Sequence, residues 1–400
     1  MIQSKLFGST LIIAGTTIGA GMLALPLASA NIGFSTSLLI MFALWLLMSF
    51  TALLMIEIHQ YADSRATLHT LAEEFLGKSG KWVATLAMLF LFYSLCAAYI
   101  AGGGAQFTTR ITEFTGLELS GTAGTLLFTL VVAGVVTFGT QIVDRVNRVL
   151  FAGKMLALVA VLFFLAPNIT HNYLLSLPVS HGLIIAAIPV IFTSFGFHGS
   201  IPAIVNYLDG NTRALRKAIL FGSAIPLVIY IFWQLVTLGV VSQSDMQTNS
   251  GLGALIGQLA QTVHQSNLGQ IIGVFADLAL LTSFLGVSLG LFEFLGDSMR
   301  KKRESLNRPL ACVVTFLPPL VFALFYPQGF IMALGYAAIA LTVLAIFLPL
   351  IMVVKVRRRA TEQHYRVFGG TPALTLTWLC GLFIVAIQIM ISCGMIPAVG

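Results

Sequence analysis

The sequence contains very few charged residues. Asp, Glu, Lys and Arg make up 9% of its 400 residues, whereas a soluble domain carries about 25%. Hydrophobic residues make up 58% of the chain, and the mean hydropathy is +0.96. This composition excludes an ordinary soluble domain and predicts a protein embedded in a membrane.

Reactive and metal-binding motifs are also missing. The chain has 4 cysteines, and no spacing among them indicates a metal site or a disulfide framework. It contains no His-Glu-x-x-His, no P-loop and no Gly-x-Ser-x-Gly. We therefore expect no enzyme, no metal and no cofactor. Without a nucleotide-binding motif, any transport must be driven by a gradient or be passive.

Long apolar runs are what the chain has in abundance. Each is long enough to cross the hydrocarbon core as a helix, which takes about 20 residues. They are too long and too evenly apolar for outer-membrane strands, which alternate over about 10 residues. We count eleven runs, at about 6–30, 33–56, 82–104, 122–140, 149–167, 183–206, 218–241, 269–296, 309–326, 330–354 and 373–395. The predicted fold is an all-α polytopic membrane protein with eleven transmembrane helices.

The positive charges lie in alternate connections. If the eleven runs alternate in direction, all but one of the 21 Lys and Arg group on one side, counting Lys154, which lies just inside a run. The exception is Arg110. The positive-inside rule makes the richer side cytoplasmic. The N-terminus is then predicted to be cytoplasmic and the C-terminus periplasmic. The net charge of +7 follows from this topology and does not indicate a nucleic-acid partner.

Small residues interrupt two of the runs at matching places. The interruptions are Gly15–Gly21 and Thr193–Ser200, and Thr16, Thr17 and Gly19 correspond to Thr193, Ser194 and Gly196 at a constant offset of 177 residues. Matched breaks of this kind point to the binding site of a transporter built from an inverted repeat. We expect a single domain over 1–400, with repeats at 6–167 and 183–354 and an added helix at 373–395. The alternative is that the glycines only allow close helix packing.

Broken helices suit a zwitterionic ligand. Half-helix N-termini present N–H groups to a carboxylate, and half-helix C-termini present carbonyls to an ammonium group. Neither break contains Asp, Glu, Lys or Arg. Phe195 and Phe197 lie in the second break and could stack on an aromatic ring, as could Tyr93 and Tyr99. His198 could bind substrate, or serve as a neutral partner for freed backbone groups.

Charged residues inside the predicted spans are candidates for ion coupling. Lys154 could load and release a proton, or its side chain could extend to the interface. Asp277 could carry a proton, or be the static partner of a hydroxyl or a helix end. The hydroxyls of Thr282 and Ser283 follow on the same run and could line a cation site, or bond to nearby carbonyls. We interpret Glu57, Glu293 and Asp297 as interfacial residues or as ion pairs with basic loops.

Four stretches resemble a known family. AGTTIGAGMLALPLASA at 14–30 is similar to the bacterial aromatic amino acid permeases, within the hydroxy and aromatic amino acid permease family. Three further stretches resemble the tyrosine-specific members more particularly. These are IPVIFTSFGFHGSIPAIVNYLDGN at 188–211, FADLALLTSFLGVSLGLF at 275–292 and TFLPPLVFALFYPQGFIMALGYA at 315–337. The tryptophan-specific members share the pattern of the first stretch.

The resemblance implies a proton symporter that imports tyrosine across the bacterial inner membrane. It also implies the five-plus-five inverted-repeat (LeuT-like) fold of the amino acid–polyamine–organocation superfamily, and it places Lys154 where sodium-coupled relatives bind sodium. The substrate residues carried over are Thr16, Thr17, Gly19, Ala20, Gly21, Ser194, Phe195, Gly196 and Phe197. The alternatives are a tryptophan or broad aromatic permease and, in a different class, a passive channel or a membrane sensor.

Overall fold

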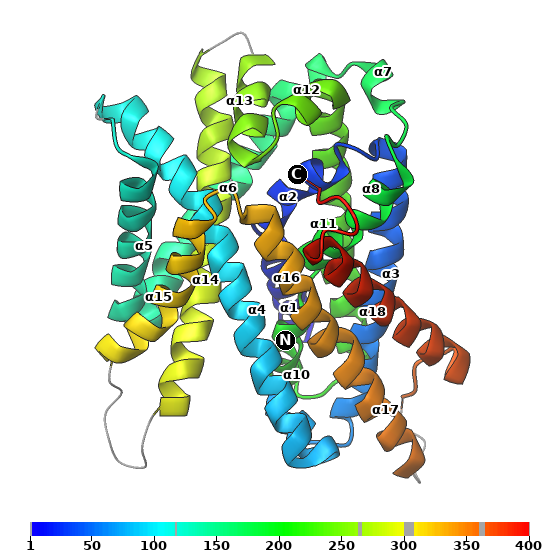
Figure 1. The fold of residues 1–400 in the computed structure, drawn as a ribbon. Helices are drawn as coiled ribbons and strands as arrows, with labels where there is room; N and C mark the ends of the chain where they lie inside the picture. The colour runs from blue at the N-terminus through cyan, green and yellow to red at the C-terminus, as the bar shows by residue number, and fades with distance from the viewer. Residues whose placement is uncertain (1, 117, 263–265, 300–307, 360–364, 400) are drawn as a thin grey trace.

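The computed structural model describes residues 2–116, 118–262, 266–299, 308–359 and 365–399. Every regular element among these residues is helical (Figure 1). Ten helices are long and apolar enough to span a membrane, or eleven when the bent pair at the N-terminus is counted as one span. This result confirms the predicted all-helical, multi-span architecture.

The spans follow the order of the predicted runs. The continuous ones are α3 (Phe34–His59), α4 (Leu68–Thr115), α5 (Gly121–Phe138), α6 (Thr140–Leu165), α11 (Thr212–Val240), α14 (Ser266–Met299), α15 (Arg308–Phe325) and α18 (Gly370–Ser392). The interrupted ones are α1 (Ile2–Thr17) with α2 (Gly21–Ser29), α8 (His181–Ala186) with α9 (Ile188–Ser194) and α10 (Ile201–Tyr207), and α16 (Phe330–Thr342) with α17 (Leu348–Arg359). A π-helical turn at Val343–Phe347 joins α16 to α17.

Two helices begin well before their predicted apolar runs. The helix α4 starts at Leu68 rather than 82, where the side chain of Thr67 caps its first turn. Gly77 interrupts it with a φ of 78°, a left-handed conformation that favours glycine. The helix α6 starts at Thr140 rather than 149. Hydropathy located the apolar part of each helix and missed its polar first turns.

The connection predicted at 242–268 contains two further helices, α12 (Gln243–Thr248) and α13 (Leu252–Thr262). The buried face of α13 consists of Leu252, Leu255, Ile256 and Leu259, which follows the period of an amphipathic helix. This face packs against α14, α2 and α4. The segment is too short to span the membrane, and it covers one end of the bundle instead.

Contacts near the ends of the spans and in the connections fall into two sets at opposite ends of the bundle (Figure 1). One set joins Lys5 to Asp209, Glu57 to Arg357, Gln60 to Tyr365 and Thr140 to Glu293. The other joins Asn31 to Val179, Thr170 to Gly239 and Leu177 to Gln243. These are the groupings that alternating spans require, and the first set belongs to the side predicted to be rich in Lys and Arg.

The first interrupted span and α10 lie behind other helices of the bundle. Figure 1 shows α1, α2 and α10 behind α16 and α4. The helix α1 packs mainly on α11, α2 packs on α9, and α9 also contacts α16. The first two interrupted spans therefore pack against each other, and α11 and α16 lie beside them.

Candidate functional site

The two helix breaks align residue for residue. The helix α1 ends at Thr17 and α2 begins at Gly21, with a bend of 51° between them. The helix α9 ends at Ser194, and a short 3-10 turn begins at His198, ahead of α10. The unwound residues are thus 18–20 and 195–197. Both boundaries obey the predicted offset, because 194 − 17 and 198 − 21 each equal 177.

The breaks touch each other. The hydroxyl of Ser194 donates a hydrogen bond to the carbonyl oxygen of Gly21, at 3.0 Å. A Cβ atom added to Gly21 would lie only 3.1 Å from the Cα of Ser194, so the close approach of the two backbones requires glycine there. The breaks therefore form one site rather than two.

Tyr230 of α11 connects the ends of both half-helices. Its hydroxyl lies 2.6 Å from the carbonyl oxygen of Thr17 and 3.0 Å from that of Ser194, which are the last residues of α1 and α9. The side chain is completely buried, and its ring meets that of Phe195 edge-on at 5.4 Å. The sequence analysis missed this residue. The available signal was the polar pair Tyr230 and Gln234, one helical turn apart in an apolar run.

Polar side chains from α6 and α14 satisfy the backbone of the first break. The ammonium group of Lys154 donates to the carbonyl oxygen of Ile18 at 2.8 Å and to the hydroxyl of Thr282 at 3.3 Å. The N–H of Ala20 donates to the hydroxyl of Ser283 at 2.8 Å. Lys154 is 2% exposed, so its ammonium group lies inside the protein rather than at the interface.

Aromatic and apolar side chains surround the second break. Phe195 and Phe197 are buried, and the residue that a Cβ on Gly196 would approach most closely is Leu341, at 3.1 Å. His198 is also buried. Its Nε2 lies 2.9 Å from the hydroxyl of Thr51, and its Nδ1 has no hydrogen-bond partner among the described residues.

Two other predicted residues point elsewhere. The Tyr93 hydroxyl donates to the carbonyl oxygen of Val314 on α15, at 2.8 Å. The Thr16 side chain is exposed, and its hydroxyl bonds to the carbonyl of Ile12 in its own helix. The hydroxyl of Thr17 is also held within α1, by Ile13. For both threonines the part that lies near the break is therefore the backbone.

Asp277 lies in a separate cluster. Its Oδ2 accepts a hydrogen bond from the Nε of Arg110 at 2.9 Å, and Arg110 also pairs with Glu113 at 2.5 Å. The Oδ1 of Asp277 is buried without a partner among the described residues. Asp277 precedes Thr282 and Ser283 by one to two turns of α14.

The acidic residues near the basic ends of the spans have different partners. Glu57 forms a two-point ion pair with Arg357, with N–O distances of 2.7 and 2.8 Å, and their side chains are 3% and 8% exposed. This contact confirms the predicted pairing of Glu57 with a basic segment. Glu293 accepts a hydrogen bond from Thr140. The side chain of Asp297 lies outside the described part of the chain.

Comparison with known proteins finds one family of amino acid permeases and several transporters that match nearly the whole chain. The model of the tryptophan/tyrosine permease family matches residues 2–388. The chain is 43% identical to the tyrosine-specific transport system 2 of Haemophilus influenzae over 404 residues, covering 100% of both chains. It is 33% identical to the tryptophan-specific transport protein of the same organism over 98% of both chains. It is also 36% identical to the glutamine transporter 2 of Aliivibrio fischeri, over 96% of this chain and 99% of that one.

Proposed function

Because the chain belongs to the tryptophan/tyrosine permease family and is an aromatic amino acid transporter, we propose that it imports tyrosine across the bacterial inner membrane by proton symport. The observation that carries this proposal is the pair of helix breaks that touch each other. Neither break contains a charged residue, and one buried lysine, Lys154, bonds to the backbone of the first. The higher identity to a tyrosine-specific relative than to a tryptophan-specific one favours tyrosine.

In this proposal the backbone holds the amino acid. The carbonyls of Thr17 and Ser194 end their half-helices and face one hydroxyl, that of Tyr230. This hydroxyl has a single O–H and each carbonyl oxygen has two lone pairs, so the carbonyls keep acceptor capacity for an ammonium group beside Tyr230. The first turn of α2 has no side-chain cap. Its Met22 and Leu23 N–H groups bond to the carbonyl oxygens of Gly19 and Ala20, and the helix dipole at this end favours a carboxylate nearby. Phe195 and Phe197 then provide the surfaces that meet the substrate ring.

Lys154 is the proposed coupling residue. Its charged ammonium group stabilises the open carbonyl of Ile18 in the first break. The neutral amine keeps two N–H donors but loses the charge that strengthens this bond. Loading and release of one proton would therefore change how firmly the break is held, which links the proton to the shape of the substrate site.

The proposed transport cycle is alternating access in an inverted repeat. The offset of 177 residues at both helix boundaries supports repeats at 6–167 and 183–354, with 373–395 appended. The basic connections favour a cytoplasmic N-terminus. Phe192, Phe195 and Phe197 are buried in and beside the second break, where a channel would need polar side chains along a pore, which favours a transporter over a passive channel.

Uptake into proteoliposomes tests the proposal. We expect labelled tyrosine to accumulate when the outside is acidic and the inside is negative, and a protonophore should abolish this accumulation. Accumulation that requires sodium and ignores pH would contradict proton coupling. Competition by unlabelled tyrosine, phenylalanine, tryptophan and glutamine then ranks the substrates, and a stronger effect of tryptophan or glutamine would contradict tyrosine specificity.

A further inference from the structure

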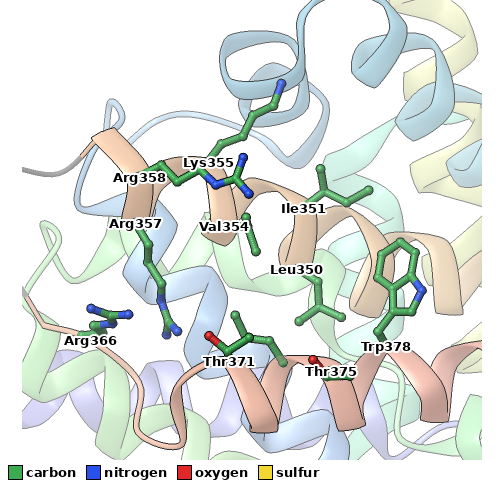
Figure 2. Close-up of a pocket in the computed structure, with 11 residues that line it drawn as sticks. Leu350, Ile351, Val354, Lys355, Arg357, Arg358, Arg366, Thr371, Thr375 and Trp378 are labelled. Atoms are coloured by element: carbon green, nitrogen blue, oxygen red, sulfur yellow. The ribbon is translucent and has the colours of Figure 1, made fainter.

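A cavity of about 620 Å³ lies between the basic end of α17 and the first turns of α18 (Figure 2). Its apolar surface includes Leu350 and Val354 from α17 and Leu374 and Trp378 from α18. Leu350 and Leu374 are buried, whereas Trp378 is 36% exposed. Apolar groups therefore line one part of a groove that opens on the outer surface of the bundle.

Basic side chains line the other part of the groove. Figure 2 shows Arg357, Arg358 and Arg366 toward one end and Trp378 at the other. Glu57 neutralises Arg357. Lys355, Arg358 and Arg366 are exposed, and none has an ion-pair partner in the described part of the chain. Counting only the residues that the structure describes, the groove thus carries three positive charges without an acidic partner.

The groove lies where a membrane boundary must pass. The apolar span that includes α16 and α17 ends at Arg358, and the span of α18 begins at Gly370. The basic end is therefore at the level of lipid headgroups, and Trp378 lies about two turns into the hydrocarbon region. Thr371 and Thr375 line the cavity between these levels and add hydroxyl donors. A ligand that fits both parts has an anionic head and an apolar tail.

We propose that this groove binds one anionic phospholipid. Its phosphate contacts Lys355, Arg358 and Arg366, and its acyl chains lie against Leu350, Val354 and Trp378. A lipid whose headgroup also carries an ammonium group is disfavoured, because that group meets the same three cations. The inference does not depend on which amino acid the protein carries.

Quenching of Trp378 tests the proposal. The full-length protein is reconstituted in phosphatidylcholine vesicles that contain increasing fractions of phosphatidylglycerol with brominated chains. The signal is the quenching that Trp378→Phe removes, which separates this groove from lipid contact at the other tryptophans. We expect half-maximal quenching at a fraction about tenfold lower than with brominated phosphatidylcholine.

Removing the charges of the groove distinguishes a specific lipid site from general attraction between basic residues and an anionic membrane. We expect Lys355→Gln, Arg358→Gln and Arg366→Gln together to abolish the preference for phosphatidylglycerol. The matched control is Arg145→Gln, Arg213→Gln and Lys217→Gln, three exposed basic residues in the first two turns of α6 and α11, on the same proposed side. An equal loss in the control, or equal quenching by both brominated lipids in the unmodified protein, overturns the proposal. So does displacement by inorganic phosphate, because it would show a site for free phosphate.

Discussion

The first and second breaks occupy matching positions in the chain but differ in their surroundings. The open backbone at 18–20 is held by Lys154 and Ser283, a cation and a hydroxyl. The open backbone at 195–197 lies among phenylalanines and Leu341. Equivalent places in two repeats can thus be specialised by the helices packed around them. In the proposed function, the first break serves the proton and the second the apolar ring.

The energies involved support this division. A buried carbonyl or N–H group left without a partner costs about 1–3 kcal/mol, and a hydrogen bond to a charged group contributes about 1.5–3 kcal/mol. The energy of the hydrogen bond from Lys154 to Ile18 is therefore large enough to shift an equilibrium between two states of the break by tenfold or more. No charged group contacts the backbone of the second break among the described hydrogen bonds and ion pairs.

The largest effect is expected from Lys154→Met. Methionine keeps an unbranched apolar stem but removes the charge and both hydrogen bonds. Uphill accumulation of tyrosine should fall between about tenfold and about a hundredfold, while exchange of labelled for unlabelled tyrosine persists. The control is Lys217→Met, which removes an exposed lysine. Normal pH-dependent accumulation in Lys154→Met, at normal membrane levels, would remove the first break from proton coupling.

An intermediate effect is expected when a methyl group is added to each break. A Cβ on Gly19 would lie 2.8 Å from the hydroxyl of Ser283 and displace the partner of Ala20. A Cβ on Gly196 meets the flexible end of Leu341 at 3.1 Å, which can yield, and the carbonyl oxygen of Thr193 at 3.2 Å, which is still farther than Ser283 is from a Cβ on Gly19. We expect Gly19→Ala to raise the KM for tyrosine by about tenfold and Gly196→Ala by less, since overpacking costs about 1–3 kcal/mol.

Gly199 provides the control for these substitutions, because no atom lies within 4 Å of its Cβ position. Gly199→Ala should leave the KM unchanged. Equal effects of Gly19→Ala and Gly196→Ala would show that the two breaks tolerate added volume alike, contrary to the contrast in their surroundings.

The smallest effect is expected from Tyr230→Phe, which removes the hydroxyl shared by both breaks and keeps the ring against Phe195. A neutral hydrogen bond contributes about 0.5–1.5 kcal/mol, so the KM for tyrosine should rise about threefold. Tyr93→Phe removes a comparable hydroxyl bond, to Val314, and should leave the KM unchanged. A larger rise in KM for Tyr93→Phe would return Tyr93 to the substrate site.

The sequence located the breaks because their cause is local. Glycine and small polar residues in an apolar run leave backbone groups open, and the constant offset paired the two runs without any knowledge of contacts. The partners of these groups depend on packing between distant segments. Tyr230 lies 36 residues from Ser194 and 213 from Thr17 along the chain. The hydrogen bond of Tyr93 to Val314 on α15 also depends on packing between distant segments, and a single sequence gives no signal for it.

Asp277 illustrates the same limit for charges. Its depth in an apolar run was clear from the sequence, but its pairing with Arg110, 167 residues away, was not. Arg110 was seen only as the exception to the charge pattern. Arg110 and Asp277 together form one cluster between α4 and α14. An unusual charge in one span therefore predicts an unusual partner in another, without showing which.

The ion pair between Glu57 and Arg357 has a consequence for the order in which the protein is made. The two residues are 300 positions apart, and the N–H of Val367 also donates to the Glu57 carboxylate. At about 5–20 residues per second, ribosomes deliver Arg357 roughly 15–60 s after Glu57. During this interval the carboxylate at the end of α3 lacks both partners. The junction of α3 with α17 therefore closes late in synthesis, when α18 is the one spanning helix of the described residues still to be made.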